Sequence, residues 1–538
     1  MISEKLKQEV LTWIKFDPDP NTAAQLSKWL ELGNEAELKR CFNGFLQFGT
    51  AGLRGPLGPG PSCMNRAVVS RTASGITEFM KKNNLTSIVI GRDSRYGSFE
   101  FAKDSAQIFS GAGIKTYLLP RELPTPVLAF AVKKLKVDVG VMVTASHNPA
   151  TDNGYKVYLG GEINNVSYHG SQIIPPVDNE ISYEIARVNL SPERSDKYEI
   201  VAESVIDEYV SEVAKLNTSP NDLKIVYTAL HGVGTETFKK VLQKAGFKDP
   251  ILVTEQINPD PEFPTTKFPN PEESGVMDLA IDYAKRFSAD IVIANDPDAD
   301  RCAIAVKNQE GTWRVVHGDE VGVAIGYYII KHRNLENKSF ANSLVSSSLL
   351  SKIAKKNQVN FHQTLTGFKW ISKVSNLAYG YEEALGYCVA PEIVNDKDGI
   401  SAAIFIAQLI NEIKLKGKTF DDYLDEIGKE FGFHQTGQIS IRVEDMNQID
   451  KILNRISDDP PMEMLGSKIE TFENLSNSKD LKTIGFRLNY AGGTRVIIRP
   501  SGTEPKLKCY IEVITSSKSH SKELMSQIKE ELTKVISC

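Results

Sequence analysis

Ser146 and His147 stand where side chains could carry out catalysis. They follow an apolar run at residues 137–143, whose β-branched residues predict a buried strand, so both lie on a loop at the carboxyl end of that strand. Ligands of open α/β sheets bind at this edge. Lys156 follows in the next extended segment, so a hydroxyl, an imidazole and an amine converge. An ordinary surface turn contains similar residue types, but later segments with matching chemistry favour a functional loop.

Asp296, Asp298 and Asp300 form a second candidate group, directly after another predicted buried strand. Three carboxylates at alternating positions repel one another unless a cation neutralises them, and hard oxygen ligands select Mg²⁺ or Ca²⁺. The loop differs from a calcium-binding EF-hand because Arg301 replaces the required glycine and Lys307 stands in place of the bidentate glutamate. We therefore predict a metal site here in preference to a solvated acidic turn.

Arg499 begins a segment that is suited to binding phosphate. Ser501, Gly502 and Thr503 follow it, so that a guanidinium, two hydroxyls and a flexible backbone come together. Arginine can grip phosphate through two hydrogen bonds, while hydroxyls and amides fill the remaining oxygens. The segment is not a Walker loop, because the G-x-x-x-x-G-K-[ST] pattern is missing. A plain hairpin turn is the alternative.

Glycine-containing segments elsewhere add candidate ligand contacts. In the glycine-rich stretch around Arg54, backbone amides can approach an anion and the guanidinium adds positive charge, although such stretches are more often only turns. Two later loops contain Gly367 with Lys369 and Glu382 with Glu383. Paired carboxylates can act as general acid and base or accept hydrogen bonds from ligand hydroxyls, and their spacing does not decide between these roles.

Composition limits the class of protein. A chain of 538 residues, 41% hydrophobic and 24% charged, predicts a globular protein with three or four domains. The net charge of −5 argues against a nucleic-acid binder that relies on overall positive charge. We expect no membrane span and no signal peptide, because no apolar run of about eighteen residues occurs and the N-terminus predicts an amphipathic helix. Six scattered cysteines without metal-binding spacing predict reduced thiols and a cytoplasmic location.

The order of elements predicts three α/β domains followed by an α+β domain. After N-terminal helices, of which the second is predicted to be capped by Asn21, helices and strands alternate at residues 66–82, 87–91, 99–112, 115–119 and 125–136. The last hundred residues predict strands near 437–443, 483–489, 494–499 and 506–513, with helices at 446–455 and 522–536. The predicted domains, which carry in turn the Ser146 loop, the aspartates, the paired glutamates and the Arg499 loop, are residues 1–205, 206–318, 319–435 and 436–538.

Four of these segments, taken in order, resemble the signatures of the α-D-phosphohexomutase superfamily, which contains phosphoglucomutases and phosphomannomutases. The matching segments are residues 144–149, 296–301, 381–386 and 499–503, and the resemblance covers nearly the whole chain. The combination of residues 48–55, 366–369 and 382–384 is similar to a branch that also contains phosphopentomutases. The resemblance implies three similar α/β domains and a fourth helix-on-sheet domain around a central cleft. It also implies that Ser146 is a phosphoserine and that the three aspartates bind Mg²⁺ together with its phosphate.

The resemblance implies a phosphosugar mutase that moves phosphate between the 1- and 6-positions of a hexose, with glucose favoured. A sugar bisphosphate such as glucose 1,6-bisphosphate would be the intermediate and activator, and alignment and charge stabilisation would do most of the catalysis. The implied roles are nucleophile and metal contact for Ser146, stabilisation of the transferring group for Arg54, and proton transfer or sugar orientation for His147, Lys156 and Lys369. Contacts to the sugar are implied for Arg301, Gly367, Glu382 and Glu383, and binding of the unreacting phosphate for Arg499, Ser501, Gly502 and Thr503.

One departure from the superfamily pattern leaves the sugar open. Ala384 stands where many members have a serine whose hydroxyl contacts the sugar, so mannose and pentose phosphates are alternatives to glucose phosphates. A sugar-phosphate-binding protein without turnover is a remoter alternative, because the serine and all three aspartates are present. A metal-dependent phosphatase would also use a serine and a metal, but it gives no reason for a separate phosphate-binding loop. The sequence predicts no oligomeric state.

Overall fold

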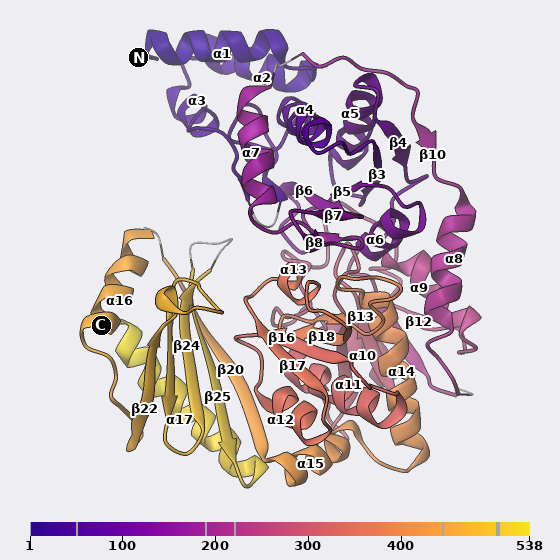
Figure 1. Cartoon of the computed structure of the whole chain (residues 1–538), viewed down its shortest axis with the longest axis vertical. Helices are drawn as coiled ribbons and strands as arrows, with labels where there is room; N and C mark the ends of the chain where they lie inside the picture. Colours follow the sequence, from indigo (N-terminus) through magenta and orange to yellow (C-terminus); the bar gives the residue numbers. More distant parts are fainter. Residues whose placement is uncertain are drawn as a thin grey trace. The chain divides into compact units, whose positions relative to one another are not determined.

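The computed structural model describes residues 2–49, 52–188, 191–219, 222–443, 446–501 and 506–537. Figure 1 shows its helices and strands, coloured along the chain. They form two compact units, one made of Met1–Val306 with Gly386–Asn411 and the other of Lys307–Leu385 with Glu412–Cys538. These units do not test the four predicted domain boundaries, which stay predictions. No helix in the described ranges combines the length and apolar character that crossing a membrane requires.

The first unit contains a mixed sheet that is built around the predicted Ser146 strand. Its strands lie in the order β1 (Phe48–Gly49), β2 (Gly52–Pro56), β6 (Asp152–Leu159), β5 (Val139–Val143), β3 (Ser87–Arg92), β4 (Lys115–Leu118) and β10 (Glu199–Ile200), with β9 (Ser171–Gln172) beside β6. β5 runs parallel to β3 and antiparallel to β6. Helices α5 (Ser98–Gly111) and α6 (Thr125–Lys134) both contact β5, and all five of its residues are buried. Because helices pack on β5 and all of its residues are buried, its sequence is continuously apolar.

Among the other helices of this region, one agrees with its predicted range and another begins at a different capping residue. The predicted helix at residues 66–82 is confirmed as α4 (Arg66–Lys82), which packs against α5 and α7 (Val177–Arg187). The N-terminal helices are α1 (Glu4–Phe16), α2 (Pro20–Glu31) and α3 (Glu35–Cys41). The predicted cap of α2 was wrong: Asp19 caps it by accepting the Asn21 N–H at 2.9 Å, and Pro20 occupies the first helical position. Proline is favoured there because its missing N–H would have no partner in the helix. A short β7 (Glu162–Ile163) pairs with β8 (Val166–Ser167).

A second sheet in the first unit carries the aspartate segment. Strands β12 (Ile251–Leu252), β11 (Ile225–Thr228), β13 (Ile291–Ala294) and β14 (Ala303–Lys307) lie side by side in that order, and the first three are parallel. The helices of this region are α8 (Glu203–Ala214), α9 (Gly234–Lys244) and α10 (Asp278–Arg286). The segment Gly386–Asn411 adds β19 (Gly386–Cys388) and most of α14 (Gly399–Leu415). All four residues of β13 are buried, so the loop that follows it begins at the carboxyl end of a core strand.

The second unit begins with a parallel arrangement of β17 (Asn360–Thr364), β16 (Ser339–Ser343) and β18 (Leu377–Glu382). Its other elements up to residue 431 are β15 (Trp313–Val315), α11 (Gly318–His332), α12 (Leu349–Lys356), α13 (Phe368–Ile371) and α15 (Phe420–Phe431). Helix α11 contacts β18 and α12 contacts β17. The carboxyl end of β18 delivers the predicted glutamate pair.

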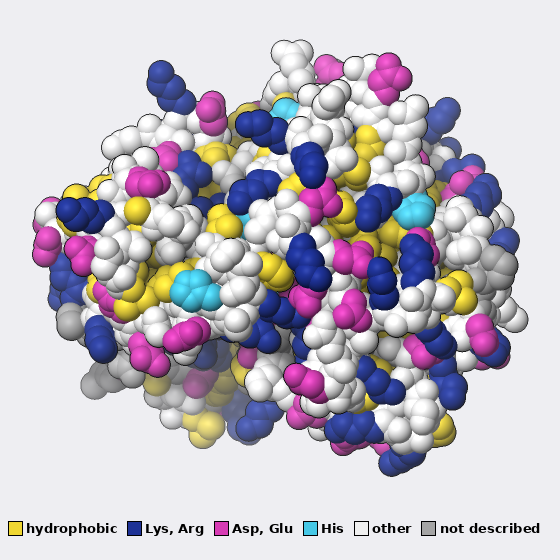
Figure 2. Space-filling view, turned by 90° about the horizontal axis from the view of Figure 1, so that it is seen from below, with side chains coloured by type: hydrophobic (Ala, Val, Ile, Leu, Met, Phe, Trp, Pro, Cys, Tyr) yellow, Lys and Arg dark blue, Asp and Glu magenta, His cyan; other side chains and the backbone are white. Residues whose placement is uncertain are grey.

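An antiparallel sheet forms the rest of the second unit. Its order is β20 (Phe433–Arg442), β25 (Lys506–Thr515), β24 (Thr494–Pro500), β23 (Phe486–Tyr490), β22 (Ser467–Asn474) and β21 (Glu463–Met464), with a short helical turn at Leu475–Asn477. Helices α16 (Met446–Asp458) and α17 (Lys518–Ser537) supply apolar side chains to the same core as the strands. The predicted helix-on-sheet arrangement is present, whereas β22 was not predicted. Figure 2 shows basic and acidic side chains intermingled over one face of the molecule.

Candidate active site

The serine loop, residues 144–149, holds Ser146 in an uncommon backbone conformation. Ser146 has a φ of +52° and is almost fully buried, with 3% of its surface exposed. Its N–H donates to the Thr144 hydroxyl at 2.8 Å. Left-handed backbone at a residue with a side chain is unfavourable, and it concentrates at functional sites where the surroundings enforce it. The loop therefore presents one hydroxyl in a fixed direction.

The Ser146 hydroxyl faces an acid and an imidazole. Its Oγ donates to Asp296 Oδ2 at 2.8 Å and lies 3.2 Å from His147 Nδ1. Burial, followed by the positive charges of Arg301, Arg54 and Lys397, holds the pKa of His147 well below its usual range. The neighbour of the hydroxyl is therefore a neutral imidazole, which can accept or donate a proton.

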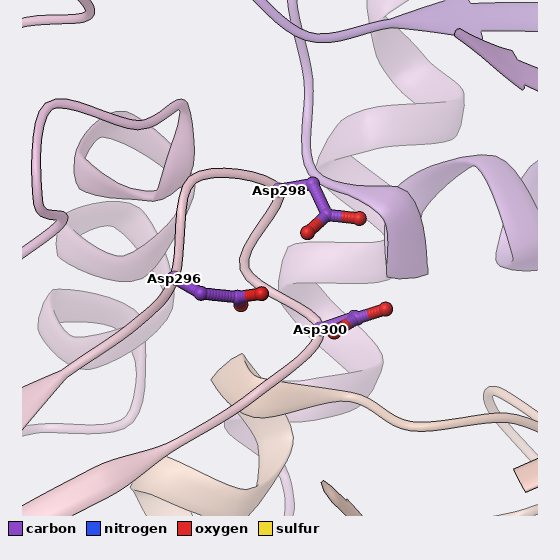
Figure 3. A group of neighbouring side chains, drawn as sticks. All are labelled: Asp296, Asp298 and Asp300. Carbon is purple, nitrogen blue, oxygen red and sulfur yellow. The ribbon is translucent and has the colours of Figure 1, made fainter. Parts of the chain in front are cut away.

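The aspartate loop, residues 295–302, gathers the three predicted carboxylates, as Figure 3 shows. Asp296, Asp298 and Asp300 are buried, and one oxygen of each lies within 4.8 Å of the others. The Oδ1 atoms of Asp298 and Asp300 are buried without a hydrogen-bond partner in the part of the chain that the structure describes. Buried carboxylate oxygens of this kind fit a hard divalent cation, which binds oxygen ligands and supplies the missing positive charge.

Two lysines and a threonine surround the aspartates. Lys156 Nζ lies 2.7 Å from Asp298 Oδ2 and 2.9 Å from Asp300 Oδ2, and Lys397 Nζ lies 3.1 Å from the same Asp300 oxygen. The Thr125 hydroxyl donates to Asp298 Oδ2 at 2.6 Å. Two ammonium groups thus lie against the three carboxylates and offset part of their negative charge.

The surroundings shift the proton affinities of these groups in opposite directions. Burial, reinforced by the charges of Asp298 and Asp300, raises the pKa of Asp296 to about 7. Burial also opposes ionisation of Asp300, but Lys156 and Lys397 outweigh it and hold the pKa of Asp300 well below its usual range. Burial would lower the pKa of Lys156, yet the neighbouring carboxylates raise it. The site is therefore a strongly interacting cluster of charges, in which each group depends on the others.

The sequence did not point to Thr125 or Lys397. Thr125 begins α6, and Lys397 lies between β19 and α14, so neither is near the aspartate loop in sequence. A lone threonine at a helix start and a lone lysine in a loop are common features of any protein surface. Only the folded chain shows that both reach the aspartates.

Arg54 and Arg301 approach the same loops. Arg54 Nη1 donates to Asn148 Oδ1 in the serine loop at 3.0 Å. The Arg301 N–H donates to Asp296 Oδ1 at 3.0 Å, while its Nη1 lies 3.1 Å from Glu272 Oε2. The first unit thus brings together these two residues and the predicted Ser146, His147, Lys156, Asp296, Asp298 and Asp300.

The glutamate pair in the second unit supports neighbouring loops. Glu382 Oε1 accepts the Gly367 N–H at 2.6 Å, and Gly367 has a φ of +108°, which favours glycine. Glu383 Oε2 accepts hydrogen bonds from the Ser343 hydroxyl at 3.0 Å and the Ser346 hydroxyl at 3.1 Å. Both carboxylates are partly exposed, and Lys369 on helix α13 is buried.

The predicted phosphate-binding segment is described only in part. Arg499 lies near the end of β24, and its Nε is buried with no hydrogen-bond partner within the described ranges. The Ser501 N–H donates to the Lys506 carbonyl at 2.8 Å. Gly502 and Thr503 lie outside the described residues. A guanidinium with a donor to spare is suited to an anionic ligand.

Family models match most of the chain in order. They describe the phosphoglucomutase/phosphomannomutase α/β/α domain I at residues 46–190, domain II at 207–311, domain III at 317–431, and the C-terminal domain at 447–534. These matches confirm the expected fold of three α/β domains and a C-terminal domain. With a buried serine facing a loop of three buried aspartates, this architecture defines an isomerase of the phosphosugar mutase class. The chain belongs to the phosphoglucomutase/phosphomannomutase family.

Relatives in this family have different names. A probable phosphomannomutase of Haemophilus influenzae is 47% identical over 87% of this chain and 96% of its own length. A human phosphopentomutase is 34% identical over 99% of this chain and 95% of its own. A phosphoglucomutase of Staphylococcus haemolyticus is also 34% identical, over 93% of this chain and 95% of its own. The reaction class is therefore shared by these relatives, while their named sugars differ.

Replacing Asp298 by asparagine tests whether the aspartate loop binds a divalent cation. A cation that binds only the folded protein stabilises it, by about 2.7 kcal/mol at a hundredfold excess over its Kd. We expect Mg²⁺ to raise the melting temperature of the wild type, and to raise that of Asp298→Asn much less, because one ligand charge is lost. Thermal denaturation with and without Mg²⁺ measures this difference.

Asp282→Asn is the control, because Asp282 lies on α10 with 65% of its side chain exposed and pairs only with Lys285 among the described salt bridges. It should keep the wild-type response to Mg²⁺. An equal Mg²⁺-dependent rise in Asp298→Asn would show that Asp298 is not a ligand.

Proposed function

We propose that the protein interconverts glucose 1-phosphate and glucose 6-phosphate through phosphorylated Ser146 and a glucose 1,6-bisphosphate intermediate. The observation that carries this proposal is the position of Ser146 Oγ, 2.8 Å from Asp296 in a loop of three buried aspartates. A serine in this position can carry a phosphoryl group next to a cation site. A phosphoglucomutase is among the relatives, at 34% identity along 93% of the chain, beside a phosphomannomutase at 47% and a phosphopentomutase at 34%, so mannose and pentose phosphates are the alternatives.

The first unit holds the transferring group. Asp296, Asp298 and Asp300 would bind Mg²⁺ together with the phosphate on Ser146, and the bound cation would offset negative charge on that phosphate. Arg54 reaches the serine loop through Asn148, so its guanidinium is placed to stabilise the same phosphate. Phosphoryl transfer needs alignment and charge stabilisation more than covalent help from the protein, and fixed cations supply both.

Each half-reaction moves one phosphoryl group and one proton. Phosphorylated Ser146 would give its phosphoryl group to the free hydroxyl of the sugar monophosphate, which loses a proton as the new O–P bond forms. The bisphosphate would then turn and return its other phosphoryl group to the Ser146 oxygen. His147, 3.2 Å from that oxygen, and Lys156 are placed to exchange the proton or orient the sugar hydroxyl.

The other predicted residues are assigned to the rest of the substrate. We assign sugar contacts to Arg301, Gly367, Lys369, Glu382 and Glu383. The unreacting phosphate would bind Arg499, Ser501, Gly502 and Thr503, because a guanidinium and hydroxyls complement phosphate oxygens. The four predicted domains, at residues 1–205, 206–318, 319–435 and 436–538, would each supply one of these functional loops.

A substrate panel tests the proposed sugar. We expect kcat/KM to be highest for glucose 1-phosphate, exceeding mannose 1-phosphate and ribose 1-phosphate by roughly tenfold, a typical discrimination from one altered contact. Coupled assays with the three substrates measure this ratio.

Ser146→Ala should lower turnover of every substrate by about 10⁴-fold or more, as loss of a catalytic nucleophile commonly does.

Other outcomes of the panel are equally clear. A preference for mannose or ribose phosphate would replace glucose and keep the mutase mechanism. Release of inorganic phosphate in place of an isomerised sugar phosphate would indicate a phosphatase. Full activity of Ser146→Ala would contradict the phosphoserine.

Arg499→Ala tests the division of labour between phosphate binding and chemistry. Losing a charge-assisted contact costs on the order of 1.5–3 kcal/mol, so kcat/KM should fall roughly ten- to hundredfold for sugar 1-phosphates and 6-phosphates alike. Phosphate on Ser146 should survive, which intact-mass analysis measures.

Arg487→Ala is the matched control for Arg499. Arg487 lies on the adjacent strand β23, where its guanidinium contacts Glu473 and Gln363, so its loss should change stability more than kcat/KM. If Arg499→Ala instead lowers the melting temperature and keeps wild-type kcat/KM, the phosphate-binding assignment is wrong.

A further inference from the structure

A buried arginine outside the predicted site holds the backbone of the serine loop. Arg95 lies between β3 and α5 and has only 3% of its surface exposed. We propose that Arg95 is a positioning residue, whose guanidinium fixes the serine loop in the conformation that aims Ser146 at the aspartates. This inference rests on the proposed function, because that function gives Ser146 its catalytic part.

Four backbone carbonyls converge on the Arg95 guanidinium. Nη2 donates to Ser146 O and to Asn148 O, both at 2.6 Å. Nη1 donates to Pro149 O at 2.7 Å and to Asp152 O at 3.0 Å. One side chain therefore spans the turn from the serine to the start of β6.

The guanidinium is itself held on its other sides. Its Nε lies 3.4 Å from Asp93 Oδ2, and the Phe263 ring centroid lies 4.9 Å from its central carbon. Asp93 is fixed in turn, because its Oδ1 accepts the Ser98 hydroxyl at 2.6 Å and the Arg95 N–H at 3.0 Å. The group is thus enclosed by an acid, an aromatic face and the serine loop, which leaves little freedom to shift.

The link to catalysis is the direction of the Ser146 hydroxyl. Ser146 keeps its φ of +52° only while the surrounding loop enforces it. Without Arg95, the carbonyls of residues 146, 148, 149 and 152 lose a shared donor, and buried carbonyls turn to find other partners. A rotation of the Ser146 carbonyl also moves the side chain of Ser146. Its Oγ, which lies 2.8 Å from Asp296, then loses its direction.

Lysine cannot replace this contact. A guanidinium is planar and carries donors on three nitrogens, so two of them can each serve two carbonyls while the third faces Asp93. A lysine ammonium offers three donors from a single nitrogen. Arg95→Lys therefore keeps the charge and loses the geometry.

Kinetics of Arg95 variants test this assignment. Misplacing a reacting group by about 1 Å can cost roughly a hundredfold in rate, so we expect Arg95→Lys to lower kcat by about that factor. KM should stay near the wild-type value, because the described hydrogen bonds of the Arg95 guanidinium go to the backbone carbonyls of residues 146, 148, 149 and 152. Phosphorylation of Ser146 by glucose 1,6-bisphosphate, followed by intact mass, should slow in parallel. In Arg95→Ala, added guanidinium should restore part of the lost kcat.

Arg92→Lys is the matched control. Arg92 is a nearby arginine at the end of β3, but its guanidinium pairs with Glu122 at 2.9 Å and does not touch the serine loop in the described contacts. It should keep wild-type kcat and KM. Should Arg95→Ala not fold, Arg95→Lys and its phosphorylation rate decide the question.

The proposal is overturned if Arg95→Lys keeps wild-type kcat. It is also overturned if Arg95→Lys loses kcat only in proportion to its unfolded fraction, because Arg95 would then act only on the fold. Failure of the proposed function looks different. In that case the wild type itself would take up no phosphate on Ser146 and turn over none of the sugar phosphates.

Discussion

Three carboxylates enclosed in protein must be neutralised, and much of the site follows from this electrostatic constraint. Asp296, Asp298 and Asp300 are all buried. Taking ionised groups out of water without compensation costs several kcal/mol, so partners have to be brought to them. Lys156 lies on β6 and Lys397 lies just before α14. The Nζ atom of each is within 3.1 Å of an aspartate oxygen. The two unpaired carboxylate oxygens of the described cluster mark where a further cation fits.

Close backbone packing keeps the aspartate loop in place. A Cβ on Gly399 would lie 2.2 Å from the Arg301 carbonyl oxygen, and one on Gly232 would lie 2.3 Å from Pro297 Cα. Only glycine fits at both positions, because no side-chain atom can approach backbone so closely. The loop is thus held by backbone contacts from two other parts of the chain, which leaves its carboxylates free to serve the site. The serine loop is held differently, by the donors of Arg95.

Local patterns in the sequence predicted helix α4 and the strands that precede the serine and aspartate loops. Burial and periodicity can be read from neighbouring residues. The site's remaining parts depend on contacts between distant segments, and a lone Lys397 gives no local signal. Asp19 rather than Asn21 caps α2 because Pro20 fixes where the helix begins. Strand β22 was not predicted, also for a local reason. Its pairing with β23 shifts register between Ile469 and Thr471, which interrupts the alternation of apolar and polar residues by which strands are recognised.

The central claim is that the phosphoryl group on Ser146 passes to the sugar and that the sugar's own phosphate replaces it. A rapid-quench chase tests this directly. Protein carrying radioactive phosphate on Ser146 is mixed with unlabelled glucose 1-phosphate and stopped within one turnover. The account predicts that the label leaves the serine, appears first in glucose 1,6-bisphosphate and then in glucose 6-phosphate. Label released as inorganic phosphate, or retained on Ser146 while glucose 6-phosphate forms, would contradict it.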